Sequence, residues 1–190
     1  MFNHIATGHV VSGFNNYVKL GYPAYRERIL DALRQDRPQT QRDYLNAMLT
    51  VLDAVIAYHL RYAQAADEAL AQTEDPDHRA NLRRIGDACR ALAHRAPESF
   101  FEAVQSTILM QEALVMETAS CSMSFGRLDQ ILNPFYEADS ISFEEAQELI
   151  YAWRIKISGI NNGYQNVMIC GCDENGRYAG NDVSVMLLRA

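Results

Sequence analysis

The sequence lacks the features that mark membrane, secreted and nucleic-acid-binding proteins. No apolar run reaches the roughly 18 residues that a membrane-spanning helix needs. The N-terminus lacks the basic start and continuous apolar core of a signal peptide, so the four cysteines are expected to stay reduced. A net charge of −7 disfavours a surface that offsets phosphate charge. These absences predict a cytoplasmic protein that handles small molecules, with neither nucleic acid nor membrane as a partner.

Common catalytic signatures are also missing. The sequence contains no P-loop, no dinucleotide-binding glycine motif, no serine-hydrolase elbow and no H-E-x-x-H zinc motif. The pair Cys170-Gly-Cys172 has no second pair of ligands at zinc-site spacing, so no metal site is predicted. A length of 190 residues allows one domain with a core of its own, or a piece of something larger.

Apolar residues recur at helical spacing through most of the chain. Helices are expected over residues 14–35 (interrupted by Pro23), 43–72, 78–94, 98–119, 128–135 and 142–158, and another begins near residue 181. Pro76 is expected to close the second of these helices. Residues 98–119 are apolar on most sides, which predicts burial nearly all round. The one predicted strand is "YQNVMICGC", residues 164–172.

Three places combine polar side chains with buried-looking neighbours. His9 precedes two valines, Ser122 lies in "SCSMSFGR", and Tyr164 begins the predicted strand. Each has a structural interpretation, because polar residues at turns and lone histidines usually satisfy local hydrogen bonds. Each could instead line a cavity, where a few polar groups among apolar walls orient a ligand. The residues alone leave both interpretations open.

Three segments, in this order, resemble one family. They are "TGHVVSGFNNYVKLGY", "PESFFEAVQSTILMQEALVMETASCSMSFGRLDQILNPFY" and "FEEAQELIYAWRIKISGINNGYQNVMICGCDENGRYAGNDVS". Together they look like the middle of the pyruvate formate-lyase-like glycyl radical enzymes, which include radical dehydratases and lyases. The resemblance covers nearly all of the chain, and residues 35–77 match only as generic helix.

The resemblance implies a ten-stranded α/β barrel in which one loop holds a glycyl radical and another holds a cysteine that becomes a thiyl radical. This chain would be a predominantly α-helical part of that barrel with few short strands: one partial domain over residues 1–190, ending before both loops. No catalytic residue is therefore assigned, and Cys121 lies in the wrong motif for the thiyl cysteine. No cofactor is expected in this chain, since an S-adenosylmethionine and iron–sulfur activating enzyme installs the radical.

The resemblance also implies which residues contact substrate. His9, Cys121, Ser122 and Tyr164 fall at substrate-pocket positions, and Asp129 and Gln130 belong to the scaffold behind the pocket. His9, Ser122 and Tyr164 are expected to converge on one cavity. A histidine and a serine at these positions favour contact with a hydroxyl or amine over a simple carboxylate clamp.

Two hypotheses for the function follow. The chain is part of a radical lyase, dehydratase or formate acetyltransferase-like enzyme that forms one wall of the substrate pocket and is inactive alone. Alternatively, it is a stand-alone helical binding or partner module derived from that family. In either case self-association is expected, through residues 98–119 or the edge of the strand 164–172, because exposed apolar faces and strand edges attract partners.

Overall fold

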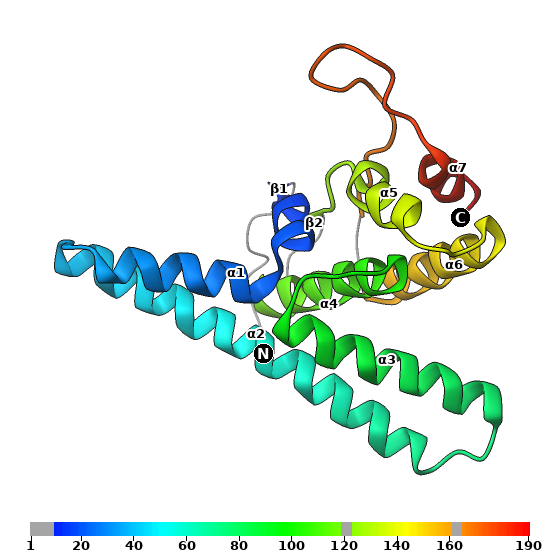
Figure 1. Cartoon of the computed structure of the whole chain (residues 1–190), viewed down its shortest axis with the longest axis horizontal. Helices are drawn as coiled ribbons and strands as arrows, with labels where there is room; N and C mark the ends of the chain where they lie inside the picture. The colour runs from blue at the N-terminus through cyan, green and yellow to red at the C-terminus, as the bar shows by residue number, and fades with distance from the viewer. Residues whose placement is uncertain (1–9, 119–122, 161–164) are drawn as a thin grey trace. The chain divides into compact units, whose positions relative to one another are not determined.

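The fold is predominantly helical. The computed structural model describes residues 10–118, 123–160 and 165–190. Figure 1 shows the elements in chain order: β1 (Val10–Val11), α1 (Phe14–Arg34), α2 (Gln39–Leu70), α3 (Pro76–His94), α4 (Phe100–Thr118), β2 (Met123–Ser124), α5 (Leu128–Ala138), α6 (Phe143–Ile160) and α7 (Asp182–Arg189). The helical segments predicted from apolar spacing are thus confirmed, with boundaries that differ by a few residues.

The chain divides into two compact units. Unit 1 contains the described residues up to Val18 and those from Glu98 onward, and unit 2 is Lys19–Pro97. Helix α1 crosses from one unit into the other after its first turn. The described residues contain only short strands, so the predicted ten-stranded barrel stays a prediction. The predicted single partial domain over residues 1–190 also stays a prediction.

Unit 2 consists of the long part of α1 followed by α2 and α3. The interruption of α1 lies at Gly21, which has φ 70° and ψ 163°, and not at Pro23 as predicted. Pro23 falls in the first turn after that break, where a missing N–H costs no helical hydrogen bond. A Cβ atom at position 21 would lie 2.7 Å from the backbone nitrogen of Ala96, so this close approach requires glycine.

The turns of unit 2 are closed by side chains that satisfy helix ends. The prediction that Pro76 closes α2 is wrong. Helix α2 ends at Leu70, and Pro76 occupies the first turn of α3. Asp75 caps α3 by accepting a hydrogen bond of 2.7 Å from the backbone N–H of His78. Arg79 donates hydrogen bonds of 2.7 Å to the carbonyls of Leu70 and Thr73, where α2 has ended.

Helix α2 carries its apolar residues only partly buried. His59, Ala63 and Ala66 are buried, whereas Tyr44 and Val51 nearer its start are 68% and 63% exposed. The first half of α2 therefore contributes little to the apolar core of unit 2.

Unit 1 is built around α4, which packs against α5 and α6 (Figure 1). No residue of α4 from Phe100 to Val115 is exposed, but many are only half-buried, so the predicted burial nearly all round is confirmed only in part; Met116 is 52% exposed. Trp153 on α6 is buried against Phe125, with ring centroids 5.2 Å apart. Along its described length α4 thus offers no broad apolar face for the predicted self-association, which remains a prediction.

The strands of unit 1 are short. Strands β1 and β2 pair in parallel, with Val10 opposite Met123 and Val11 opposite Ser124. The predicted strand over residues 164–172 is wrong in its described part, where Met168 and Cys172 form only isolated bridges. The reason is local: Cys170 and Gly171 have φ values of 59° and 83°, which extended strands do not adopt. Among the described residues, no helix combines the length and apolar character needed to cross a bilayer.

Candidate functional site

The predicted pocket residues lie next to described residues that are joined to one another. His9, Cys121, Ser122 and Tyr164 fall outside the described residues. The segments that follow them begin at Val10, Met123 and Gln165. The structure therefore describes the three segments that follow the predicted pocket residues, and the contacts among these segments are given below.

Two glutamines tie these segments to the buried helix α4. Gln111 on α4 is fully buried and donates through Nε2 to the Gln165 side-chain oxygen at 2.7 Å and to the Met123 carbonyl at 3.3 Å. Gln165 donates through its own Nε2 to the same Met123 carbonyl at 2.6 Å. Because Met123 O can only accept, these contacts fix the orientation of both side-chain amides. The Gln111 side-chain oxygen is buried without a hydrogen-bond partner.

A second set of contacts continues along the same two segments. The Ser124 hydroxyl donates to the carbonyl of Asn166 at 3.2 Å. Met168 exchanges backbone hydrogen bonds with residues 126–128, donating to Gly126 O at 3.1 Å and accepting from Leu128 N at 3.2 Å. Residues 123–128 and 165–168 are thus held side by side through side-chain and backbone hydrogen bonds.

The carboxylate of Asp129 lies in the first turn of α5, which directly follows residues 123–127. It is fully buried and accepts hydrogen bonds from Cys170 N at 2.6 Å, the Ser184 hydroxyl at 2.6 Å and Gln130 N at 2.8 Å. Ser184 also belongs to the capping box of α7, in which Asn181 accepts from Ser184 N at 3.1 Å. One side chain therefore joins the loop at Cys170, the start of α5 and the start of α7. Asp129 thus holds several segments together, and its predicted place behind a substrate pocket stays a prediction.

An open cleft lies where α5 begins. Its volume is about 520 Å³, and its lining is Arg127, Gln130, Cys172, Asp173, Glu174 and Asn175. Arg127 donates to the carbonyl of Cys172, and Gln130 donates to the carbonyl of Cys170 at 3.0 Å. The side chains of Arg127 and Gln130 therefore bind backbone carbonyls of the loop that lines the cleft. Within the described residues, no three His, Cys, Asp or Glu side chains gather as they would around a metal ion.

Comparison with known proteins decides the family. The pyruvate formate lyase-like family matches residues 1–190. The chain belongs to this family.

Relatives in the pyruvate formate lyase-like family include radical enzymes with solved structures. The chain is 26% identical to (2S)-3-sulfopropanediol dehydratase of Klebsiella oxytoca over 212 residues, covering 99% of this chain and 26% of the dehydratase. The structure resembles the glycerol-bound B12-independent glycerol dehydratase of Clostridium butyricum with a TM-score of 0.91 and 29% identity, over 95% of this chain and 26% of that one. It also resembles substrate-bound hydroxyproline dehydratase of Clostridioides difficile with a TM-score of 0.89 and 25% identity, over 100% of this chain and 27% of that one. The chain thus spans about a quarter of the length of the relatives it matches.

Sequence reasoning missed the buried amides of this pyruvate formate lyase-like chain. Gln111 lies in the segment 98–119 that the sequence predicts to be apolar on most sides, and Gln147 lies in α6, where it donates to the Met186 carbonyl at 3.1 Å. An amide inside an apolar run is itself a signal, because a buried polar group needs a partner. That signal says a partner exists, but it does not say which distant segment supplies it.

Proposed function

We propose that this chain is part of a glycyl radical enzyme, a radical lyase, dehydratase or formate acetyltransferase-like enzyme, and forms one wall of its substrate pocket. His9, Cys121, Ser122 and Tyr164 would face the substrate. The observation that carries this proposal is the register of β1 and β2, which pairs Val10 with Met123, while Gln165 donates to the Met123 carbonyl.

The register supports convergence through chain geometry. His9, Ser122 and Tyr164 each precede one of the three joined residues by a single peptide, and consecutive Cα atoms are about 3.8 Å apart. Paired strands lie about 4.8 Å apart, so residues one step before a parallel pair start from neighbouring positions. Tyr164 directly precedes Gln165, whose side chain reaches the Met123 carbonyl, and this supports a place for Tyr164 near the same wall.

The residue types support a polar substrate. A serine hydroxyl donates and accepts a hydrogen bond, and a neutral imidazole offers one donor and one acceptor. Such a pair suits the hydroxyl groups of a small polyol or hydroxylated compound, and relatives of this chain are named as dehydratases of sulfopropanediol and glycerol. The buried amides of Gln111 and Gln165 would orient this wall without touching the substrate.

The radical chemistry would come from elsewhere in the enzyme. The glycine that stores the radical and the cysteine that becomes the thiyl radical are expected outside these residues, and a partner activating enzyme would install the radical. The residues of this chain bind the substrate, orient it and exclude water. Alone, the chain would be inactive.

One experiment tests the convergence on the chain itself. The double variant His9→Cys with Ser122→Cys is prepared with serine in place of the native cysteines and mildly oxidised. We expect a disulfide between positions 9 and 122, because a parallel pair lies within the 4.4–6.8 Å Cα separation that a disulfide requires. The matched control pairs His9→Cys with Glu174→Cys, on an exposed turn, and should stay reduced. Equal disulfide formation by both variants, or none by the first, would overturn the pocket.

A second experiment tests inactivity alone. The chain is incubated with an S-adenosylmethionine-dependent activating enzyme of the family, and electron paramagnetic resonance is recorded under anaerobic conditions. We expect no glycyl radical signal from the isolated chain. A signal would contradict the assignment of the radical glycine to another part of the enzyme.

One observation favours the alternative of a helical partner module. Tyr44 and Val51 project apolar area from the first half of α2 without cover in unit 2. Exposed apolar side chains on one helix suit a protein partner. Reading the gene beyond Ala190 tests the choice: a continuing frame with the cysteine and glycine loops supports the enzyme, and a stop codon supports the module or one half of a split enzyme.

A further inference from the structure

The loop Cys170–Cys172 is held more firmly than its exposure suggests. Cys170 is half-buried and Cys172 is exposed, and neither forms a disulfide. Four backbone groups of this loop are hydrogen-bonded: Cys170 N to Asp129, Cys170 O to Gln130, Gly171 O to Ala179 N at 2.9 Å, and Cys172 O to Arg127. The two cysteines therefore keep a fixed relation to each other.

The backbone of this loop bends between the two cysteines. Cys170 is the one described non-glycine residue with positive φ, and Gly171 also has positive φ. In an extended strand, residues two apart are separated by about 6.8 Å, at the upper limit of the Cα separation in a disulfide. A turn at Cys170 and Gly171 takes the chain out of that extended conformation and favours a shorter separation.

The two thiols differ in access. Cys170 is half-buried, and its backbone N–H is bonded to the buried carboxylate of Asp129. Cys172 lines the open cleft at the start of α5. An incoming reagent therefore meets Cys172 before Cys170.

We propose that Cys170 and Cys172 form a dithiol that exchanges with small-molecule disulfides and closes a disulfide within the loop. The Cys172 thiolate attacks one sulfur of the reagent, forming a mixed disulfide and releasing one thiolate. The Cys170 thiolate then attacks the Cys172 sulfur and releases the second thiolate. The two cysteines are oxidised by two electrons, the reagent is reduced to two thiols, and the two cysteine protons end on the released thiols.

The fixed loop explains why the second step stays within one chain. Bringing together two groups that are already close loses little chain entropy, since the cost of closure grows with the length of the loop. The mixed disulfide at Cys172 is therefore short-lived when Cys170 is present. This inference concerns the loop alone and holds whatever the candidate pocket binds.

Oxidised glutathione is the probe for this proposal. The chain is used with Cys121→Ser, so that reactive thiols are confined to known positions, and its intact mass and peptides are followed by mass spectrometry. We expect loss of two hydrogen atoms, no lasting glutathione adduct and a peptide that links Cys170 to Cys172. Cys89, which is buried in α3, serves as the internal control and should stay unmodified.

Two serine variants of the same protein separate the roles of the thiols. Cys170→Ser should accumulate one glutathione on Cys172, because the resolving thiol is absent. Cys172→Ser should react at least tenfold more slowly, because the remaining thiol, that of Cys170, is half-buried. Two lasting adducts on the parent protein, linkage between chains, or no reaction at either cysteine while the fold is intact by circular dichroism would overturn the proposal.

Discussion

The two compact units use polar side chains in different places. In unit 1 the polar groups are inside: Asp129, Gln111 and Gln147 are buried, and they bond to backbone and side chains far away in the sequence. In unit 2 the polar contacts lie mostly on the surface of neighbouring helices. Buried networks specify one arrangement of loops, because every unmet partner costs free energy, whereas surface pairs tolerate change.

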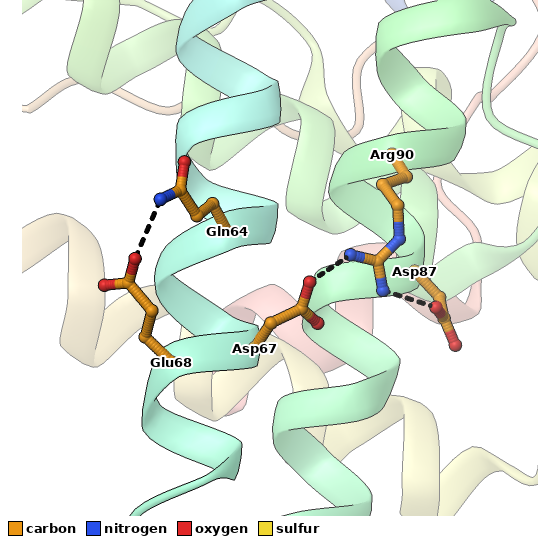
Figure 2. Close-up of polar contacts among 5 residues, drawn as sticks. All are labelled: Gln64, Asp67, Glu68, Asp87 and Arg90. Atoms are coloured by element: carbon orange, nitrogen blue, oxygen red, sulfur yellow. Dashed lines mark hydrogen bonds and ion pairs between the residues drawn. The ribbon is translucent and has the colours of Figure 1, made fainter.

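Figure 2 shows the surface contacts of unit 2. Arg90 on α3 reaches across to Asp67 on α2 at 2.8 Å and bonds Asp87 on its own helix at 2.9 Å. Gln64 and Glu68 form another contact of 2.8 Å along α2. Of these contacts, only the Arg90–Asp67 pair links two helices, and those helices also pack against each other. The comparison teaches that unit 1 is the part of the chain where polar residues position loops.

The largest expected effect comes from removing the Asp129 carboxylate. Asp129→Ala leaves three donors inside unit 1 without their acceptor, at Cys170, Gln130 and Ser184. We expect a loss of about 3–5 kcal/mol in the free energy of unfolding, because each buried donor left without a partner costs about 1–3 kcal/mol. Urea unfolding followed by circular dichroism measures it. Glu174→Ala on the exposed turn is the control and should change stability by less than about 0.5 kcal/mol.

A smaller effect is expected at Trp153. Its Nε1 donates to the Thr107 hydroxyl at 3.1 Å in the core of unit 1. Trp153→Phe removes this hydrogen bond and part of the packed ring, so the free energy of unfolding should fall by about 1–3 kcal/mol. Ile155→Ala, on the exposed face of the same helix, should be nearly neutral in the same assay. Equal losses for both variants would contradict the inward orientation of Trp153.

His59 is a buried titratable side chain of unit 2. Burial lowers the pKa of His59 below its ordinary value of 6.5, although its hydrogen bond to Val55 O works in the other direction. Between the lowered pKa and 6.5 the unfolded chain binds more protons, so stability is complete above pH 6.5 and falls as the pH drops through this window. His59→Phe should flatten this dependence in thermal unfolding between pH 7.5 and about 5. His94→Gln, at an exposed position, should leave it unchanged.

The smallest effect is expected at Arg90. Its two ion pairs are solvent-exposed, so Arg90→Gln should cost about 0.2–1 kcal/mol, and added salt should shrink the difference. Arg83→Gln on the same helix is the control. A loss as large as that of Asp129→Ala would abolish the contrast between the two units.

The helices could be predicted from sequence because their signals are local. Apolar spacing predicts the long helices of the described residues, and Ser142 caps α6 by accepting from Glu145 N at 3.1 Å. Proline gave an ambiguous signal: Pro76 could end one helix or begin the next, and the cap at Asp75 decides for the second. Whether such a proline ends one helix or begins the next depends here on one capping hydrogen bond, and the sequence does not show whether that bond forms.

The loops could not be predicted in the same way. The alternating apolar pattern of residues 164–172 predicts a strand, but the conformation of Cys170 depends on Asp129, which is 41 residues away. For the candidate site, resemblance to the family named His9, Ser122 and Tyr164, and these stay predictions. The buried side chains that hold the segments next to these residues, such as Gln111 with Met123 and Gln165, can be identified only from the folded structure.

The contact between Gly21 and Ala96 has a consequence for the history of the chain. These residues lie near the two ends of unit 2, and their backbones touch. A segment of almost eighty residues thus leaves and rejoins the chain at one point, as an inserted cassette does. Lengthening, shortening or exchanging this segment would leave the spacing of its two ends unchanged. Insertions and deletions among related proteins are therefore expected mainly within unit 2, at the turns between α1, α2 and α3. An engineered protein could replace unit 2 by a short turn.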